Sequence, residues 1–127
     1  MSALVLDAGA FVAVDHGVRA MLARLRAAQQ HGFELRTTGA VVAQVWRDPR
    51  GRQVNLARVL NAVDVRAVDD RLGRDAGVLL GYAAAGDAVD ATVVAIAAPG
   101  DRVLTSDPRD FRQLVAASRR PVLVVTV

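Results

Sequence analysis

Short apolar segments alternate along this chain with longer segments that have helical periodicity. We expect strands at 3–6, 33–37, 63–68, 103–105 and 121–127. Helices are expected between them at 18–29, 38–47, 50–63, 69–84, 87–98 and 108–116. Strands that alternate with helices form a mainly parallel sheet that is covered on both faces. The sequence therefore predicts an α/β fold, in which a mainly parallel β-sheet is sandwiched by helices in an α/β/α arrangement.

The chain has the size and composition of one domain. Its 127 residues are 53% hydrophobic, and no repeat or linker divides them, so we expect a single domain over 1–127. Asp7 and Asp15 interrupt the apolar N-terminal segment, which predicts neither an export signal nor a membrane span. The absence of cysteine suits a cytoplasmic protein that has no disulfides and no thiolate metal site.

All 16 basic residues are arginine, and the net charge is +3. Arginine binds phosphate groups through two parallel hydrogen bonds, so this composition permits binding to nucleic acid. The same composition is also what GC-rich codon usage produces. Charge alone leaves both interpretations open.

Carboxylates follow two of the expected strands. Asp7 comes directly after 3–6, and Asp107 closely follows 103–105. In parallel sheets, ligands bind outside the carboxyl ends of the strands, so neighbouring strands would bring these two side chains into one crevice. Asp90 begins an almost wholly apolar helix, where an ionised carboxylate needs an arginine, backbone amides or a divalent cation shared with the other two.

Helix capping is the alternative explanation for each carboxylate taken singly. Asp7, Asp87 and Asp107 all stand at expected N-cap positions. Asp90 and Asp110 follow three residues after the second and third of these caps, as in a capping box. Capping and ligand binding therefore both remain open from the residues alone.

A shared cation at this crevice would be a hard ion. Oxygen ligands favour Mg²⁺ or Mn²⁺, and the chain offers no thiolate. Its two histidines, His16 and His31, lie next to glycine near expected helix ends, and we do not expect them to be ligands.

Three segments resemble the acidic motifs of PIN domains, and most closely those of VapC-type toxin ribonucleases of bacterial toxin–antitoxin pairs. They are LVLDAGAFVA, DAVDATVVAIA and VLTSDPRDF, in this order and at matching spacing along nearly the whole chain. The resemblance implies a parallel sheet sandwiched by helices. It also implies that three or four acidic residues hold one or two Mg²⁺ or Mn²⁺ ions and that the protein hydrolyses RNA.

By position, the resemblance implies that Asp7, Asp90 and Asp107 are the catalytic metal ligands. Asp110 matches an additional acidic position. The remaining residues with an implied supporting role are Thr105 and Ser106 at the strand end and Asp87 at the helix start.

The sequence departs from the family pattern at Gln44. The family has a second acidic residue, a glutamate, in the helix after the second strand, and Gln44 is in register with it. The loss of one negative charge should weaken the binding of a second metal ion. Asp48, one turn later, offers partial compensation or is a solvated residue before Pro49.

The predicted function is that of a metal-dependent endoribonuclease, with Arg47, Arg50 and Arg52 as candidate contacts to the RNA backbone or as ordinary solvated residues. The alternative is a PIN-like module that binds RNA or an antitoxin and is catalytically weakened by Gln44. A receiver-like phosphotransfer domain is less consistent with the sequence, because the chain contains no lysine. The resemblance implies an RNA substrate, a small antitoxin partner and a homodimer; no membrane contact is expected.

Overall fold

Five short strands form one parallel sheet in the order β3-β2-β1-β4-β5. The computed structural model describes residues 1–47 and 50–127. The strands are β1 (Ala3–Leu6), β2 (Glu34–Thr38), β3 (Asp64–Arg66), β4 (Arg102–Thr105) and β5 (Leu123–Thr126). The helices are α1 (Ala8–Asp15), α2 (Arg19–Gln30), α3 (Gly39–Val45), α4 (Val54–Asn61), α5 (Asp70–Ala83), α6 (Ala88–Ala95) and α7 (Pro108–Ser118).

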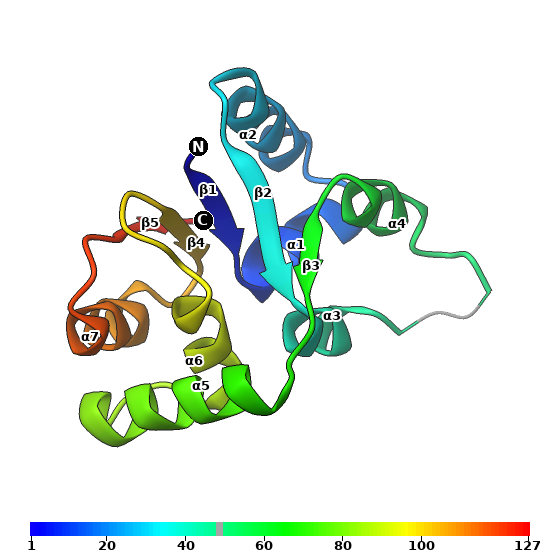
Figure 1. The fold of residues 1–127 in the computed structure, drawn as a ribbon. Coiled ribbons are helices and arrows are strands. Elements are labelled where there is room, and N and C mark those ends of the chain that lie inside the picture. Colours follow the sequence, from blue (N-terminus) through cyan, green and yellow to red (C-terminus); the bar gives the residue numbers. More distant parts are fainter. Residues whose placement is uncertain (48–49) are drawn as a thin grey trace.

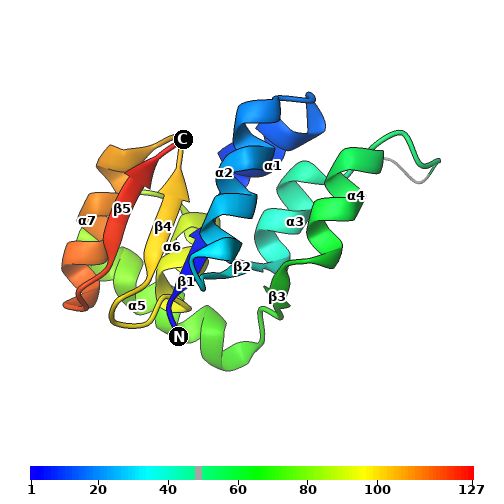
Figure 2. The ribbon, with the colours of Figure 1, turned by 90° about the horizontal axis from the view of Figure 1, so that it is seen from above.

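Helices cover the sheet from both sides. Helices α5, α6 and α7 pack against one another in one layer, and α1 packs with α2, α3 and α4 in the other (Figures 1 and 2). The chain passes from β1 through β2 to β3 in one direction and then returns to β4 and β5 on the other side of β1. The predicted α/β/α fold with a parallel sheet is therefore confirmed, and the strand order changes direction between β1 and β4.

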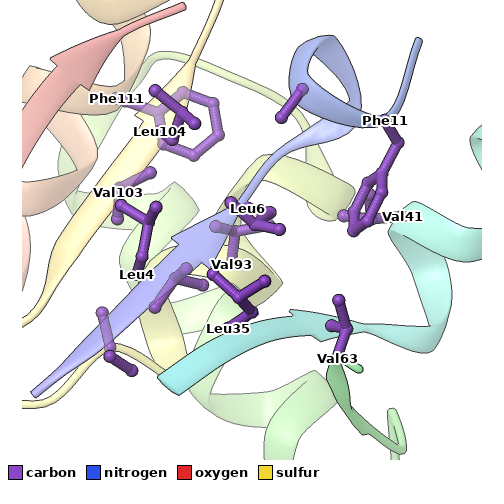
Figure 3. Close-up of a cluster of buried hydrophobic side chains, with 14 of the residues drawn as sticks. Leu4, Leu6, Phe11, Leu35, Val41, Val63, Val93, Val103, Leu104 and Phe111 are labelled. Atoms are coloured by element: carbon purple, nitrogen blue, oxygen red, sulfur yellow. The ribbon is translucent and has the colours of Figure 1, made fainter. Parts of the chain in front are cut away.

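The central strands are apolar because both of their faces are buried. All four residues of β1 are buried, as are Val103, Leu104 and Thr105 of β4. Figure 3 shows the side chains that fill the space between the sheet and its helices, among them Leu6, Phe11, Val93 and Phe111. Burial of such runs on both faces is typical of parallel sheets.

Several predicted elements are longer than the observed ones, and the structure gives a cause for two of them. The third strand covers only Asp64–Arg66 instead of 63–68, because it pairs with β2 alone and all three of its residues are exposed. Helix α6 ends at Ala95 instead of 98, and the Arg120 guanidinium donates to the carbonyl oxygens of Ala95 and Ala97 beyond its end. Such side-chain donors commonly satisfy the last carbonyls of a helix.

The amino end of the sheet is joined by a buried aspartate. The Asp101 carboxylate accepts from the amides of Ala3 and Ala98 at 2.8 Å each. The Arg36 guanidinium lies 3.9 Å from the same carboxylate. Asp101 thus links β1, the segment after α6, and β4, with its charge compensated.

Among the described residues, no single helix is long and apolar enough to cross a membrane. Helices α5 and α6 meet the length and composition criteria only when they are taken together, and this pair is bent by 109°.

Candidate metal centre

Asp7 and Asp107 lie at the same end of the sheet because β1 and β4 are parallel neighbours. The Thr105 hydroxyl donates to Asp7 Oδ2 at 2.9 Å and accepts from the Asp107 amide at 2.9 Å. The Asp7 amide also donates to the Leu104 carbonyl at 3.0 Å. Thr105 therefore fixes the first carboxylate relative to the turn that carries the second.

Gly9 permits the close approach of α1 to the turn after β4. A Cβ atom on this residue would lie 2.8 Å from Ser106 Oγ and 3.3 Å from the Ser106 amide nitrogen. A side chain here would clash with the Ser106 side chain, which would have to shift. The glycine in LVLDAGAFVA thus allows α1 to pack closely against the turn that precedes Asp107.

Asp87 and Asp90 form a reciprocal capping box at the start of α6. Asp87 Oδ1 accepts from the Asp90 amide at 2.9 Å, and Asp90 Oδ2 accepts from the Asp87 amide at 3.3 Å. The capping explanation holds for this pair. It does not account for Asp7 or Asp107, whose side chains make no capping hydrogen bond although both residues stand at N-cap positions.

Three carboxylates meet beside this capping box. Asp90, Asp107 and Asp110 each offer an oxygen, and these oxygens all lie within 4.8 Å of one another. Pro108 begins α7 directly after Asp107, which places Asp110 in the first turn of the helix and on the side of Asp90. The tightest acidic group therefore contains Asp110 and not Asp7, which is 6% exposed and bound to Thr105.

The carboxylates resist ionisation in one another's presence. Burial raises the pKa of Asp90 to about 6, and the negative charges of Asp87, Asp7 and Asp107 act in the same direction. Burial also raises the pKa of Asp7, against the opposing effects of the Ala8 amide and the Thr105 hydroxyl. These directions are those expected for buried acids close to like charges.

The pKa of Asp110, at the surface of the group, is also raised. Desolvation and the charge and hydrogen bond of Asp107 raise the pKa of Asp110, which Arg109 partly offsets. Within the described chain, neither Asp110 nor any other of these acidic residues forms a salt bridge. The three carboxylates are thus placed where they could hold a divalent cation.

The other predicted residues occupy more peripheral positions. Ser106 is exposed at the turn after β4, and Gln44 is exposed near the end of α3. The Arg47 guanidinium donates to the carbonyl oxygens of Ala43 and Trp46, both at 2.8 Å. Arg50 and Arg52 are exposed in the segment between α3 and α4, and Asp48 lies outside the described residues.

Sequence reasoning missed two threonines that position α6. Thr38 Oγ1 and Thr92 Oγ1 lie 3.0 Å apart, and the Thr92 hydroxyl also donates to the Val89 carbonyl at 2.6 Å. This buried contact connects the carboxyl end of β2 to the helix that carries Asp90. A polar residue inside the apolar run ATVVAIA was the available signal.

No protein-family model matches this chain, and no curated protein matches it either. Solved structures do match. One is a chain from the crystal structure of VapBC2 from Rickettsia felis bound to a DNA fragment from their promoter; it is 13% identical, with a TM-score of 0.69 over 98% of this chain and 98% of that chain. At this identity, the comparison shows that the two chains share a fold.

Proposed function

We propose that this protein is a metal-dependent endoribonuclease similar to VapC toxins, which hydrolyses phosphodiester bonds in RNA. The observation that carries the proposal is the group of three carboxylate oxygens from Asp90, Asp107 and Asp110 within 4.8 Å. The shared fold with a chain of the R. felis VapBC2 complex supports it. So does the position of the acids at the carboxyl end of parallel strands, where α/β folds bind their ligands.

The donor set fits a hard divalent cation. Oxygens bound to one Mg²⁺ at about 2.0–2.1 Å lie about 3 to 4 Å apart, so small side-chain rotations would bring these carboxylates around a shared ion. Asp90, Asp107 and Asp110 would hold Mg²⁺ or Mn²⁺, and Asp7 would contribute from its place beside Thr105. A cation would also offset the burial and the like-charge repulsion that together raise the pKa of Asp90 to about 6.

The acidic residues would divide the chemistry among them. A bound divalent cation would lower the pKa of the attacking water and stabilise negative charge on the scissile phosphate. Asp107, the exposed member of the group, or Asp110 in the first turn of α7 would orient this water or accept its proton. Thr105 acts as a positioning residue through Asp7 and the Asp107 amide.

RNA would approach the acidic group across the exposed arginines that follow α3. Arg50 and Arg52 are exposed in this segment, and Arg47 is held against the end of the helix by two carbonyl oxygens. Guanidinium groups pair well with phosphate. We therefore propose that Arg47, Arg50 and Arg52 contact the phosphates of the RNA backbone.

A small antitoxin is the proposed protein partner. The R. felis structure contains VapBC2, a pair of this kind, bound to promoter DNA. A segment of the partner that places an arginine among Asp90, Asp107 and Asp110 would neutralise the group in the same way as a cation. The product of the adjacent reading frame is the candidate to test for binding.

A second candidate is a PIN-like module that binds RNA or an antitoxin with weak catalysis. It is favoured by Gln44, whose neutral and exposed amide stands where the resembling family has a glutamate. The group of three acids described above argues for the enzyme, since it is complete without Gln44.

The experiment is a cleavage assay on structured RNAs with Mg²⁺ or Mn²⁺. The wild-type protein should cut RNA, EDTA should abolish cutting, and Asp107→Asn should lose it. Asp107 is exposed, so this substitution should leave the fold intact, as circular dichroism can check. Equal cutting by the wild type and the variant would contradict the proposal, and binding of RNA without cutting would favour the second candidate.

A further inference from the structure

A cavity of about 370 Å³ lies between α2 and the sheet. Its floor consists of apolar side chains from three neighbouring strands: Leu4 of β1, Leu104 of β4 and Val125 of β5. Leu104 pairs with Val125, and Leu4 pairs with Arg102, two residues before Leu104, so these side chains share one face of the sheet. Helices α6 and α7, which carry the acidic group, belong to the layer on the other face (Figure 2). The cavity is therefore separate from the candidate metal centre.

The wall of the cavity comes from one side of α2. Four residues at helical spacing, from the helix and its C-cap, form it: Arg24, Ala27, Ala28 and His31. Phe33 and Arg102 complete the lining, and the Arg102 guanidinium carbon lies 4.8 Å from the centre of the Phe33 ring. This cation–π contact holds the charge of Arg102 beside the apolar floor.

The rim of the cavity is positively charged. Among the described residues that line it, two are arginines and none is a carboxylate. Neither Arg24 nor Arg102 forms a salt bridge within the described chain. The acids next to the lining residues in sequence, Glu34 and Asp101, both lie against Arg36 instead, at 2.7 Å and 3.9 Å. The charge of the rim is thus left for an anion from outside the chain.

His31 adds a further polar group to this rim. Its Nδ1 atom lies 2.7 Å from the Ala27 carbonyl oxygen. A carbonyl oxygen can only accept, so Nδ1 is the donor, and Nε2 is the ring nitrogen that remains for a ligand. The polar groups therefore lie along the α2 side and at Arg102, above a floor of aliphatic side chains.

We propose that this cavity binds a small organic anion, with an aromatic body on the apolar floor and a phosphate or carboxylate group paired with Arg24 and Arg102. Its volume is in the range of small-molecule sites, which are likewise mostly apolar with a few polar groups that orient the ligand. Guanidinium groups pair with phosphate and carboxylate alike, and they stack on aromatic rings. Charge complementarity therefore selects the anion, and the floor selects its body.

A fluorescence titration with anilinonaphthalene sulfonate, an aromatic anion, tests the site. The wild-type protein should bind one probe molecule saturably, and Arg24→Gln or Arg102→Gln should each weaken binding about tenfold, as expected when a charge-assisted hydrogen bond is lost. Arg26→Gln is the matched control, because Arg26 is exposed on the same helix but lines a different surface. Absence of saturable binding, or equal weakening by Arg26→Gln and Arg102→Gln, would overturn the proposal.

Filling the cavity is an independent test that leaves the charges in place. Ala27 is exposed and lines the cavity, so Ala27→Trp should abolish probe binding while circular dichroism is unchanged. Ala23→Trp is the control, since Ala23 is an exposed residue of α2 outside the lining. Unchanged binding in Ala27→Trp, or equal loss in the two variants, would place the probe elsewhere and overturn the proposal.

Competition against the bound probe identifies the chemistry of the ligand. Naphthyl phosphate and naphthoate should displace the probe, and the stronger of the two shows whether the anionic group is a phosphate or a carboxylate. Naphthalenemethanol, which has no charge, and inorganic phosphate, which has no apolar body, should each compete at least tenfold less well. Equal displacement by the neutral compound would overturn the assignment to an anion. All titrations are made in EDTA and without RNA, so their outcome is independent of the proposed ribonuclease activity.

Discussion

The two ends of the sheet both concentrate aspartates, but only the amino end neutralises them. There, Asp101 accepts from the amides of Ala3 and Ala98 and lies 3.9 Å from the Arg36 guanidinium. The same arginine pairs with Glu34 at 2.7 Å. A carboxylate with this many donors stabilises the fold, because groups within the protein compensate its negative charge.

At the carboxyl end the acids face one another. Asp90, Asp107 and Asp110 bring their oxygens within 4.8 Å, with no arginine in a salt bridge to them in the described chain. Burial, and secondarily the nearby negative charges, raise the pKa of Asp90 to about 6. The comparison distinguishes a carboxylate that stabilises the fold through its donors from a group of carboxylates with no such donors, which is the arrangement that a bound cation would compensate.

The largest expected effect is on catalysis, from Asp90→Asn. Removing one ligand from a cation that supplies several kcal/mol to the transition state should lower RNA cleavage by about a hundredfold to a thousandfold. Stability without metal should not fall, because the substitution also removes repulsion. Asp70→Asn is the control, since Asp70 is exposed and pairs only with Arg74 on its own helix. Cleavage by Asp90→Asn at the wild-type rate would contradict the proposal that the acids at the carboxyl end bind a catalytic cation, in contrast to Asp101 at the amino end.

The second effect, from Asp101→Asn, should be on stability alone. An amide oxygen can replace one acceptor but not both, so a buried N–H of Ala3 or Ala98 loses its partner at a cost of about 1–3 kcal/mol. Urea denaturation measures the loss, and RNA cleavage per folded molecule should be unchanged. Asp64→Asn, at an exposed ion pair near the same end, should cost less than about 1 kcal/mol. A loss of activity with full stability would show that Asp101 belongs to the site.

A third effect should appear in the pH dependence of stability. Asp90 has a pKa of about 6 in the folded protein and about 3.9 when unfolded, so the folded state binds its proton more tightly. Without metal, stability should therefore fall as pH rises from about 4 to about 6, by about 1 kcal/mol after allowance for solvent screening.

Urea titrations in EDTA across this pH range measure that slope. Asp90→Asn should reduce this slope without abolishing it, because Asp7 and Asp110, whose pKa values are also raised, remain in the variant. Mg²⁺ should raise the stability of the wild type more at pH 7 than at pH 5, since it binds the ionised form. The same slope in wild type and variant would assign the effect to other groups.

The sequence predicted the fold well because parallel strands leave a simple pattern. The apolar runs that become β1 and β4 were identified correctly, and the sequence analysis made the convergence of the acids that follow them conditional on these strands being neighbours, which they are. Which acids meet most closely could not be predicted, since capping and ligand positions share one spacing. The separation of Asp7 from Asp110 depends on contacts distant in sequence, such as Gly9 against Ser106 and Thr105 with Asp7.

Asp101 and Asp107 illustrate the limit. Both flank the same strand, one at each end, and in the sequence each is an aspartate beside an apolar run. Only the fold shows that Asp101 meets the amides of Ala3 and Ala98, whereas Asp107 meets other acids. The difference follows from the direction of β4, because Asp101 precedes this strand and Asp107 follows it. Parallel α/β sheets bind their ligands at the carboxyl ends of the strands.

The smallest expected effect comes from Gln44→Glu. Gln44 is exposed near the end of α3, and α3 packs against α6, so an added negative charge here would make the potential around the acidic group more negative. Affinity for Mn²⁺, measured by calorimetry, should rise by no more than about threefold, which is less than about 1 kcal/mol. Ala43→Glu adds the same charge at the preceding exposed position, which faces another side of the helix, and should do less. A gain in cleavage confined to Gln44→Glu would mean that the native site is weakened; equal effects of the two variants would mean that Gln44 acts only through general charge.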